Sequence, residues 1–382
     1  MLAAALLLAF LIVRTATVQA FVAKDPSRAA AFWPGHPTAF LESGLSEVGK
    51  LAAAGQPIER PLIEPLLAAS TKAPLAPEPF LVRGVEAQLA GNEHLALQAF
   101  LAARQRDPRA TAARYFLADH YLKTGENAAG LAEVSALARL VPQSLPSVAP
   151  FLASYARSPG AAPHVKAMLQ GEPQLERVLL DQLAADPGNL NLMLYLWSGR
   201  GGDDAKLWQS RLLNGLIDSG RVDEARNAWM RFAGVKTEKD RLVDAEFTAH
   251  PPPPFGWTLA SGPAGAAEPL SGGRLHLLFY GRDDAVLASQ LLTLPPGRYR
   301  LSMQVSGVSA TSKSLSWTLK CLGGAATVIS IPLDRAGAIA APITVPGGCP
   351  AQRLELVGNA LEIPEQSQAT ISHLQLQHEG GS

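Results

Sequence analysis

Cys321 and Cys349 are the two cysteines of this 382-residue chain, and 28 positions separate them. In an exported protein an isolated pair this close together usually forms one disulfide. Two thiols alone cannot complete the four-ligand shell of a zinc site, and no histidine lies near them in the sequence. We therefore expect a disulfide between Cys321 and Cys349. In a cytosolic protein the same pair would be two buried free thiols.

Other reactive chemistry is hard to find. The sequence has no glycine-rich phosphate loop, no GxSxG or HExxH motif and no cluster of metal ligands, and its eight histidines are scattered. Asp283 and Asp284 offer oxygen ligands for calcium, yet two carboxylates in one loop do not define a site. We expect no catalytic residue, metal or cofactor. The alternative that stays open is an enzyme whose pair of carboxylates lies on opposed strands.

Charge and apolar content limit the partners and the location. Lysine plus arginine equal aspartate plus glutamate at 33 each, so the chain lacks the basic excess that nucleic-acid binding requires. Residues 2–13 are an uninterrupted apolar run followed by Arg14. We expect residues 1–23 to be a signal anchor, single-pass in the inner membrane with the bulk of the chain in the periplasm. Cleavage after Ala20, giving a secreted or periplasmic protein, and a buried helix of a cytosolic protein are the alternatives.

After the N-terminal segment, the sequence predicts a series of helices. Residues 25–247 are rich in alanine and leucine at helical spacing, and Gly91–Gly125 and Pro108–Pro142 share an interval of 34 residues. A repeat of that length is one helix–turn–helix unit, which must stack on its neighbours to bury its apolar face. In residues 78–108, small residues precede an aromatic residue, another small residue and a proline. This pattern resembles the tetratricopeptide repeat (TPR), and the resemblance continues at 112–142 and 207–237.

The composition changes after residue 247. The proline run in 248–254 predicts an extended linker. Residues 255–380 then contain at least eight short segments of alternating apolar residues separated by proline and glycine, as expected for an antiparallel β-sandwich. The fold class we expect is therefore multidomain, α then β: an N-terminal membrane or signal helix, a TPR-like α-solenoid and a C-terminal sandwich.

Residues 289–305 (SQLLTLPPGRYRLSMQV) and the terminal ATISHLQL resemble segments of jelly-roll carbohydrate-binding modules. The resemblance implies a jelly-roll sandwich that binds glycan. Such a site needs aromatic faces that stack on sugars and polar groups that bond to hydroxyls. Plainer roles exist for the same residues, with the tryptophan in the core and residues 281–284 as a polar loop. The candidate ligand-binding residues are Trp257, Tyr280, Arg282, Asp283, Asp284 and Gln290.

Together these observations predict a non-catalytic, exported scaffold or adaptor in cell-envelope or surface-polysaccharide assembly. The helical repeats would bind a protein partner, the sandwich would contact a polysaccharide or another protein, and the N-terminal segment would contact the membrane. A structural protein–protein interaction module that binds no sugar is the first alternative, and an enzyme with an unrecognised carboxylate site in the β domain is the second.

Overall fold

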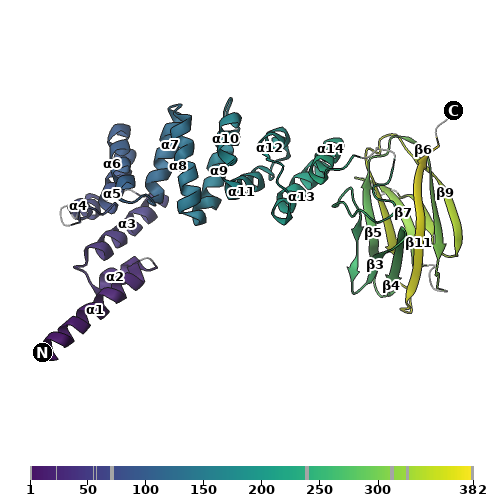
Figure 1. The fold of residues 1–382 in the computed structure, drawn as a ribbon, viewed down its shortest axis with the longest axis horizontal. Coiled ribbons are helices and arrows are strands. Elements are labelled where there is room, and N and C mark those ends of the chain that lie inside the picture. The colour runs from purple at the N-terminus through teal and green to yellow at the C-terminus, as the bar shows by residue number, and fades with distance from the viewer. Residues whose placement is uncertain are drawn as a thin grey trace. The chain divides into compact units, whose positions relative to one another are not determined.

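The structure is a computed structural model that describes residues 2–22, 24–54, 56, 58–68, 73–236, 241–309, 314–323 and 327–379. Positions 1, 23 and 380, which bound segments expected from the sequence, lie outside these ranges. The expected order of a helical region followed by an antiparallel two-sheet region is confirmed (Figure 1). The chain forms two compact units: Met1–Leu183 with Asn191–Ser198, and Ala184–Leu190 with Gly199–Ser382.

The first unit is built from helices joined by short turns. Among the described residues, no helix combines the length and the apolar character needed to cross a membrane, so the structure gives no support to the membrane helix expected at 1–23. The helices are α1 (Leu2–Val22), α2 (Pro26–Phe32), α3 (Pro37–Ala53), α4 (Arg60–Ala68), α5 (Glu78–Leu89), α6 (Glu93–Arg106), α7 (Thr111–Lys123), α8 (Asn127–Leu140), α9 (Leu145–Ala156), α10 (Ala162–Leu169), α11 (Pro173–Leu183) and α12 (Leu190–Leu196), whose first residue belongs to the second unit.

The 34-residue interval is visible in the helix pairs α5–α6 and α7–α8. Helices α6 and α8 begin 34 residues apart, at Glu93 and Asn127, and end 34 residues apart. The turns before them contain Gly91 and Gly125, whose φ angles of 70° and 83° lie in the left-handed region that favours glycine. The helix–turn–helix recurrence is therefore present, while assignment of these pairs to the TPR family stays a prediction.

The second unit begins its main part with a helix pair, α13 (Asp203–Asp218) and α14 (Val222–Ala233), and continues into two antiparallel sheets. One sheet has the strand order β1-β5-β10-β7-β8, and the other has the order β2-β3-β4-β11-β6-β9. The strands are β1 (Thr258–Leu259), β2 (Ser261–Gly262), β3 (Gly265–Leu270), β4 (Arg274–Phe279), β5 (Ala285–Leu292), β6 (Gly297–Ser306), β7 (Leu315–Cys321), β8 (Thr327–Pro332), β9 (Gly337–Val345), β10 (Gln352–Gly358) and β11 (Ser367–His378).

The core of the sandwich lies between the two sheets. In β7, Leu315, Trp317 and Leu319 belong to this core, as the alternation of apolar residues predicts. Strands β8 and β9 each end one sheet, and they contain Pro332 and Pro342. Because proline donates no backbone hydrogen bond, it is tolerated on such edge strands and hinders pairing with a further strand.

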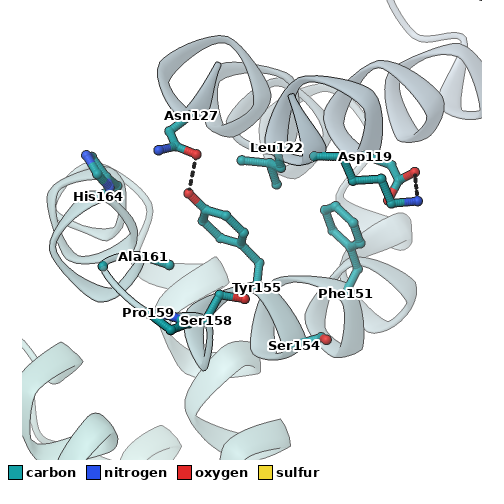
Figure 2. Close-up of a pocket in the computed structure, with 12 residues that line it drawn as sticks. Asp119, Leu122, Asn127, Phe151, Ser154, Tyr155, Ser158, Pro159, Ala161 and His164 are labelled. Atoms are coloured by element: carbon teal, nitrogen blue, oxygen red, sulfur yellow. Dashed lines mark hydrogen bonds and ion pairs between the residues drawn. The ribbon is translucent and has the colours of Figure 1, made fainter. Parts of the chain in front are cut away.

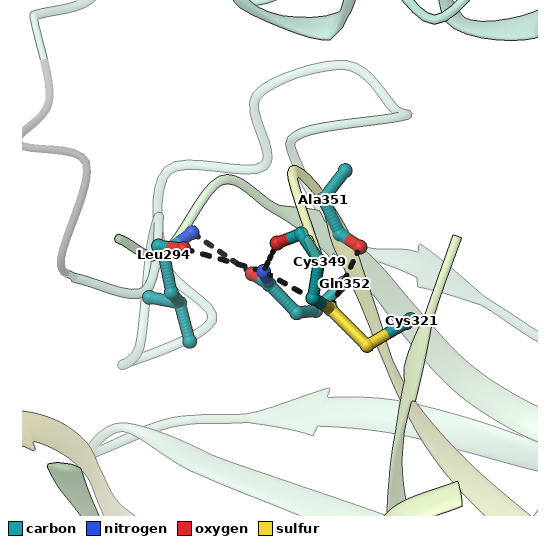
Figure 3. Close-up of a disulfide and its surroundings, with 5 residues drawn as sticks. All are labelled: Leu294, Cys321, Cys349, Ala351 and Gln352. Carbon is teal, nitrogen blue, oxygen red and sulfur yellow. Dashed lines mark hydrogen bonds between the residues drawn. A yellow bond between two sulfur atoms is a disulfide. The ribbon is translucent and has the colours of Figure 1, made fainter. Parts of the chain in front are cut away.

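The expected disulfide is present and joins Cys321, at the end of β7, to Cys349, just before β10 (Figure 3). Gln352 lies beside it, fully buried, and its side-chain amide makes several hydrogen bonds. Its Nε2 donates to the carbonyl of Cys349 at 2.7 Å and to that of Leu294 at 3.2 Å, and its Oε1 accepts from Leu294 N at 2.8 Å. The disulfide and this glutamine thus connect β7, β10 and the segment after β5.

The proline run, for which the sequence predicts an extended linker at 248–254, makes hydrogen bonds to the elements before and after it. Trp229 of α14 donates from Nε1 to the carbonyl of Pro252 at 2.7 Å, and its ring centroid lies 5.6 Å from that of Phe255. On the other side, Leu291 N of β5 donates to the carbonyl of Pro254 at 2.9 Å. Within the second unit, the run is therefore bonded both to the last helix pair and to the first sheet.

Candidate binding groove

A groove of about 650 Å³ opens in the helical unit between the pair α7–α8 and the pair α9–α10 (Figure 2). Phe151 and Tyr155, both half-buried on α9, supply its aromatic surface. Helix α9 lies against its neighbours through buried apolar residues of its other face, which leaves these two rings directed toward α7 and α8. The remaining lining residues are Asp119, Leu122, Lys123, Asn127, Ser154, Ser158, Pro159, Gly160, Ala161 and His164.

Four polar side chains of the groove are paired with one another. The hydroxyl of Tyr155 donates to Oδ1 of Asn127 at 2.7 Å, and burial raises the pKa of the Tyr155 phenol. Lys123 Nζ lies 2.7 Å from Asp119 Oδ2, so the two charges at this end offset each other. Ser154, Ser158 and His164 are exposed and also line the groove. The groove therefore combines a nearly neutral, partly aromatic floor with hydrogen-bonding edges.

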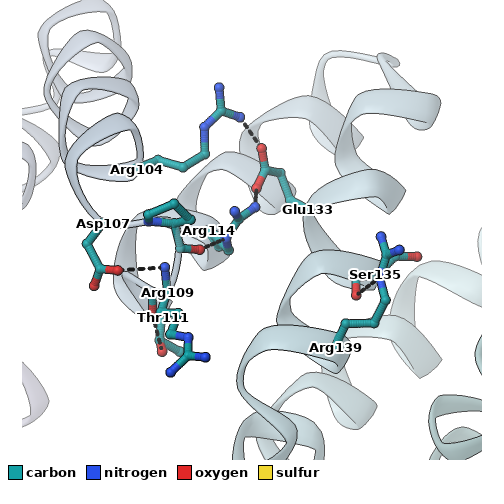
Figure 4. Close-up of polar contacts among 9 residues, drawn as sticks. Arg104, Asp107, Arg109, Thr111, Arg114, Glu133, Ser135 and Arg139 are labelled. Atoms are coloured by element: carbon teal, nitrogen blue, oxygen red, sulfur yellow. Dashed lines mark hydrogen bonds and ion pairs between the residues drawn. The ribbon is translucent and has the colours of Figure 1, made fainter.

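A buried charge cluster braces the helices that form one wall of the groove (Figure 4). Glu133 of α8 accepts hydrogen bonds from Arg104 of α6 and from Arg114 of α7, so one carboxylate ties three helices together. Arg114 also donates from Nε to the carbonyl of Pro108. Glu133 and Arg114 are buried, whereas the Arg104 side chain is 29% exposed. The ion pair between Arg114 and Glu133 holds α7 to α8.

The side chains that line the groove supply an aromatic surface and several hydrogen-bonding groups. Among the residues that the structure describes, no three His, Cys, Asp or Glu side chains lie close enough to hold a metal ion. His164, Ser154 and Ser158 all line the groove, and within the described part of the chain no hydrogen bond joins the histidine to either serine as a nucleophile–base pair. What the site offers to a ligand is stacking, apolar contact and hydrogen bonds.

Two of the residues predicted to bind sugar are core residues. Trp257 is 8% exposed, packs 5.8 Å from the Trp317 ring and donates from Nε1 to the carbonyl of Asp244. Gln290 is 1% exposed, and its amide bonds to both the N–H and the C=O of Val243, at 3.1 and 2.8 Å. Both side chains are used to fasten residues 241–250, which we call the strap, to the sandwich. They are therefore not available to a ligand, and the sequence prediction is corrected for these two positions.

The other four predicted residues lie together between β4 and β5. Tyr280 is half-buried, while Arg282, Asp283 and Asp284 are exposed. The carboxylate of Asp284 accepts a hydrogen bond from Ala360 N at 2.7 Å, which ties this loop to the segment after β10. Of the seven aromatic Phe, Tyr and Trp side chains in the described part of 241–379, Tyr280 is the one that is not buried.

Sequence reasoning did not identify the groove. Its central residues Phe151, Ser154 and Tyr155 lie in the stretch where the helical pattern departs from the 34-residue interval. The one local signal was the Ser158–Gly160 turn between α9 and α10, where Gly160 has a φ of 76°. That signal predicts a turn between two helices, but it says nothing about which helix faces leave a hollow.

Comparison with known proteins adds little to this geometry. No protein-family model matches the chain, and no curated protein sequence matches it. Among solved structures, the chain is similar to a carbohydrate-binding module, TmCBM61, determined in complex with beta-1,4-galactotriose. That match has 14% sequence identity and a TM-score of 0.23, and it covers 32% of this chain and 88% of that chain. At these values we assign no ligand and no site residue from it.

Proposed function

We propose that this protein is a non-catalytic adaptor whose helical unit binds an extended peptide segment of a partner protein in the groove between α7–α8 and α9–α10. The observation that carries the proposal is the pair of half-buried rings, Phe151 and Tyr155, at the floor of a groove of about 650 Å³ with polar rims. The 34-residue recurrence of the helix pairs supports the same function, because stacked helix pairs present extended binding surfaces.

A peptide suits this groove for a physical reason. An extended chain places apolar side chains and backbone hydrogen-bonding groups alternately along its length, and the groove offers partners for both. The aromatic floor contributes contact area at low entropic cost, because rings have few rotatable bonds. The offset charges of Asp119 and Lys123 indicate a segment without a strong net charge.

Peptide selection on the full chain tests this function. A phage library of random peptides is panned on the immobilised protein, and enriched sequences are measured against Ser154→Trp, which fills the groove from an exposed position. Ala132→Trp, on an exposed part of α8 that does not line the groove, is the matched control. We expect at least about ten-fold weaker binding to the first variant and unchanged binding to the second. Failure to enrich any peptide family, or equal binding to both variants, would refute the proposal.

A second candidate function is glycan binding by the sandwich, and the exposed loop around Tyr280 is the observation that favours it. Tyr280 provides one partly exposed ring, with Arg282 and Asp283 beside it as hydrogen-bonding groups. Affinity electrophoresis of the full chain through gels that contain neutral, acidic or amino polysaccharides measures such binding. Retardation that Tyr280→Ala abolishes and Val286→Ala preserves would support this function. Equal mobility in every gel leaves the sandwich as a structural module.

The disulfide supports a location outside the cytosol, because oxidising compartments are where structural disulfides form and persist. Our proposal is therefore an exported protein of the cell envelope, which is where surface-polysaccharide assembly takes place. Intact cells that contain the protein can be lysed in a maleimide–polyethylene glycol reagent. Without reductant, we expect no polyethylene glycol to be attached to the protein. After reduction, we expect two molecules to be attached, one at each cysteine. Two additions without reductant would place the protein in a reducing compartment.

A further inference from the structure

Helix α1 has two parts with different surroundings. From Arg14 onward it is packed against its neighbours: Val18 is 1% exposed and lies in a small core with Ala29 of α2 and Ala39 of α3, both fully buried. Before Arg14, the described side chains are exposed and apolar. Leu7, Leu8, Phe10, Ile12 and Val13 are each 60–63% exposed, and Leu11 is 43% exposed.

These six exposed apolar side chains are distributed around the whole helix. At 100° per residue they point in directions that leave no polar face. A protein groove covers one face of a helix, whereas lipid chains contact every face at once. A lipid bilayer is therefore the environment that removes every face of this apolar helix from water.

The boundary between the two parts has the chemistry of a membrane interface. The guanidinium of Arg14 lies 4.1 Å from the centroid of the Trp33 ring, and the guanidinium of Arg28 lies 4.9 Å from that of Phe21. Tryptophan and basic residues are typical of the headgroup region. From residue 14 to residue 28 there are three basic residues and one acidic residue, Asp25, an excess that complements anionic headgroups.

The hydroxyls near this boundary are satisfied within the helix. Thr15 Oγ1 donates to the carbonyl of Leu11, and Thr17 Oγ1 donates to that of Val13, both at 2.8 Å. Polar groups with internal partners can approach the hydrocarbon without the penalty of an unmade hydrogen bond.

We propose that α1 is retained in the mature protein and that its residues before Arg14 insert into a lipid bilayer, with Arg14 and Trp33 at the headgroup level. At 1.5 Å per residue, residues 2–13 of α1 form about 18 Å of helix, and the proposal concerns the insertion of this part. Cleavage after Ala20 would remove Val18 and uncover Ala29 and Ala39. This inference does not rest on the proposed peptide binding, and neither test depends on the other.

Vesicle flotation with the full chain tests insertion. The protein is mixed with vesicles of about three parts phosphatidylcholine to one part phosphatidylglycerol, which supply the anionic surface. The variant Leu8→Glu/Ile12→Glu places two charges in the apolar part, and Ala16→Glu places one at an exposed position in the packed part. We expect the wild type and Ala16→Glu to float, and the double variant to float about ten-fold less or not at all.

Two further measurements keep the result interpretable. Thermal unfolding followed by circular dichroism should be the same for the double variant and Ala16→Glu, since both leave the packed part intact. Tryptic digestion of the protein isolated from cells should release Thr15–Lys24 as one peptide. A wild type that stays at the bottom of the gradient, a double variant that floats equally, or a peptide that begins at Phe21 would each overturn the proposal.

Discussion

Removing the carboxylate of Glu133 should be among the most damaging single changes in the helical unit. Glu133 is 5% exposed and is the shared partner of Arg104 and Arg114. Loss of one member of a buried ion pair costs about 3–5 kcal/mol, because an uncompensated charge stays buried. Arg104 is 29% exposed and can recover water, and Arg114 keeps its bond to a backbone carbonyl, so we place Glu133→Ala near the lower limit, at about 3 kcal/mol. Glu133→Gln, which keeps an acceptor but no charge, should cost about 2 kcal/mol.

Urea unfolding of the full chain measures this loss of stability. Far-ultraviolet circular dichroism is the signal to follow, because it reports mainly on the helical part. With a slope of about 2 kcal/mol per molar urea, Glu133→Ala should lower the midpoint by about 1.5 M. Replacing both partners, as in Arg114→Met/Glu133→Leu, should bring the midpoint much closer to the wild type, because no uncompensated charge then stays buried between α7 and α8. Arg139→Met is the exposed control, since its side chain is 68% exposed and its ion pair should contribute less than about 0.5 kcal/mol.

Two outcomes would refute this reasoning. If Glu133→Ala shifts the midpoint by less than about 0.3 M, the buried pair contributes no more than a surface pair does. If the double replacement is as unstable as Glu133→Ala, the loss comes from packing around α7 and α8, and the charge is not its cause.

Three further changes test other parts of the structure. Cys321→Ser/Cys349→Ser opens a 28-residue loop and should destabilise the sandwich by about 3–4 kcal/mol, seen as a lower thermal midpoint than that of the oxidised wild type. Burial, and next the nearby carboxylate of Glu78, raise the pKa of Glu42 above its ordinary value of 4.5. The folded state thus holds this proton more tightly, and the associated stability, present below pH 4.5, is lost as pH rises through the raised pKa. Glu42→Gln should flatten that part of the profile of thermal midpoint against pH, and an unchanged profile would contradict the assignment. Gln290→Leu leaves two backbone groups of the strap buried without partners, which should cost about 2–3 kcal/mol and speed amide exchange at residue 243.

The broad organisation could be predicted because it depends on local patterns. Helical spacing up to residue 236 and period-two alternation after 255 are properties of short windows, and each element needs only its own sequence to show them. The disulfide was predictable for the same reason, since two cysteines leave a single pairing. Assignment of residues to units was harder. The sequence places a boundary at the proline run, whereas α13 and α14 belong with the sandwich through contacts such as Trp229 to Pro252.

The candidate sites show why residue type alone is a weak guide. Tryptophan and glutamine are typical of sugar sites because they combine apolar surface with hydrogen bonding, and a folded core uses those same properties. Gln290 satisfies a buried backbone segment, and Trp257 fills the core while its N–H bonds to a carbonyl. Whether such a side chain faces solvent depends on which segment covers it, and the covering strap lies 13 to 47 residues away in the chain. No local pattern contains that information.

The same contacts determine which fragment can be used to study the sandwich alone. A fragment that begins at residue 252 would lack the strap and α14. Gln290 would then have no partner for its buried amide, and the carbonyl of Pro252 would lose the Trp229 N–H. Phe247, which is 3% exposed within the sandwich core, would leave a cavity. A fragment that begins at Gly199 keeps all of these contacts, because they lie within the second unit. Loss of glycan binding in the shorter fragment would therefore be evidence of damage to the fold, and only the longer one can report on the loop around Tyr280.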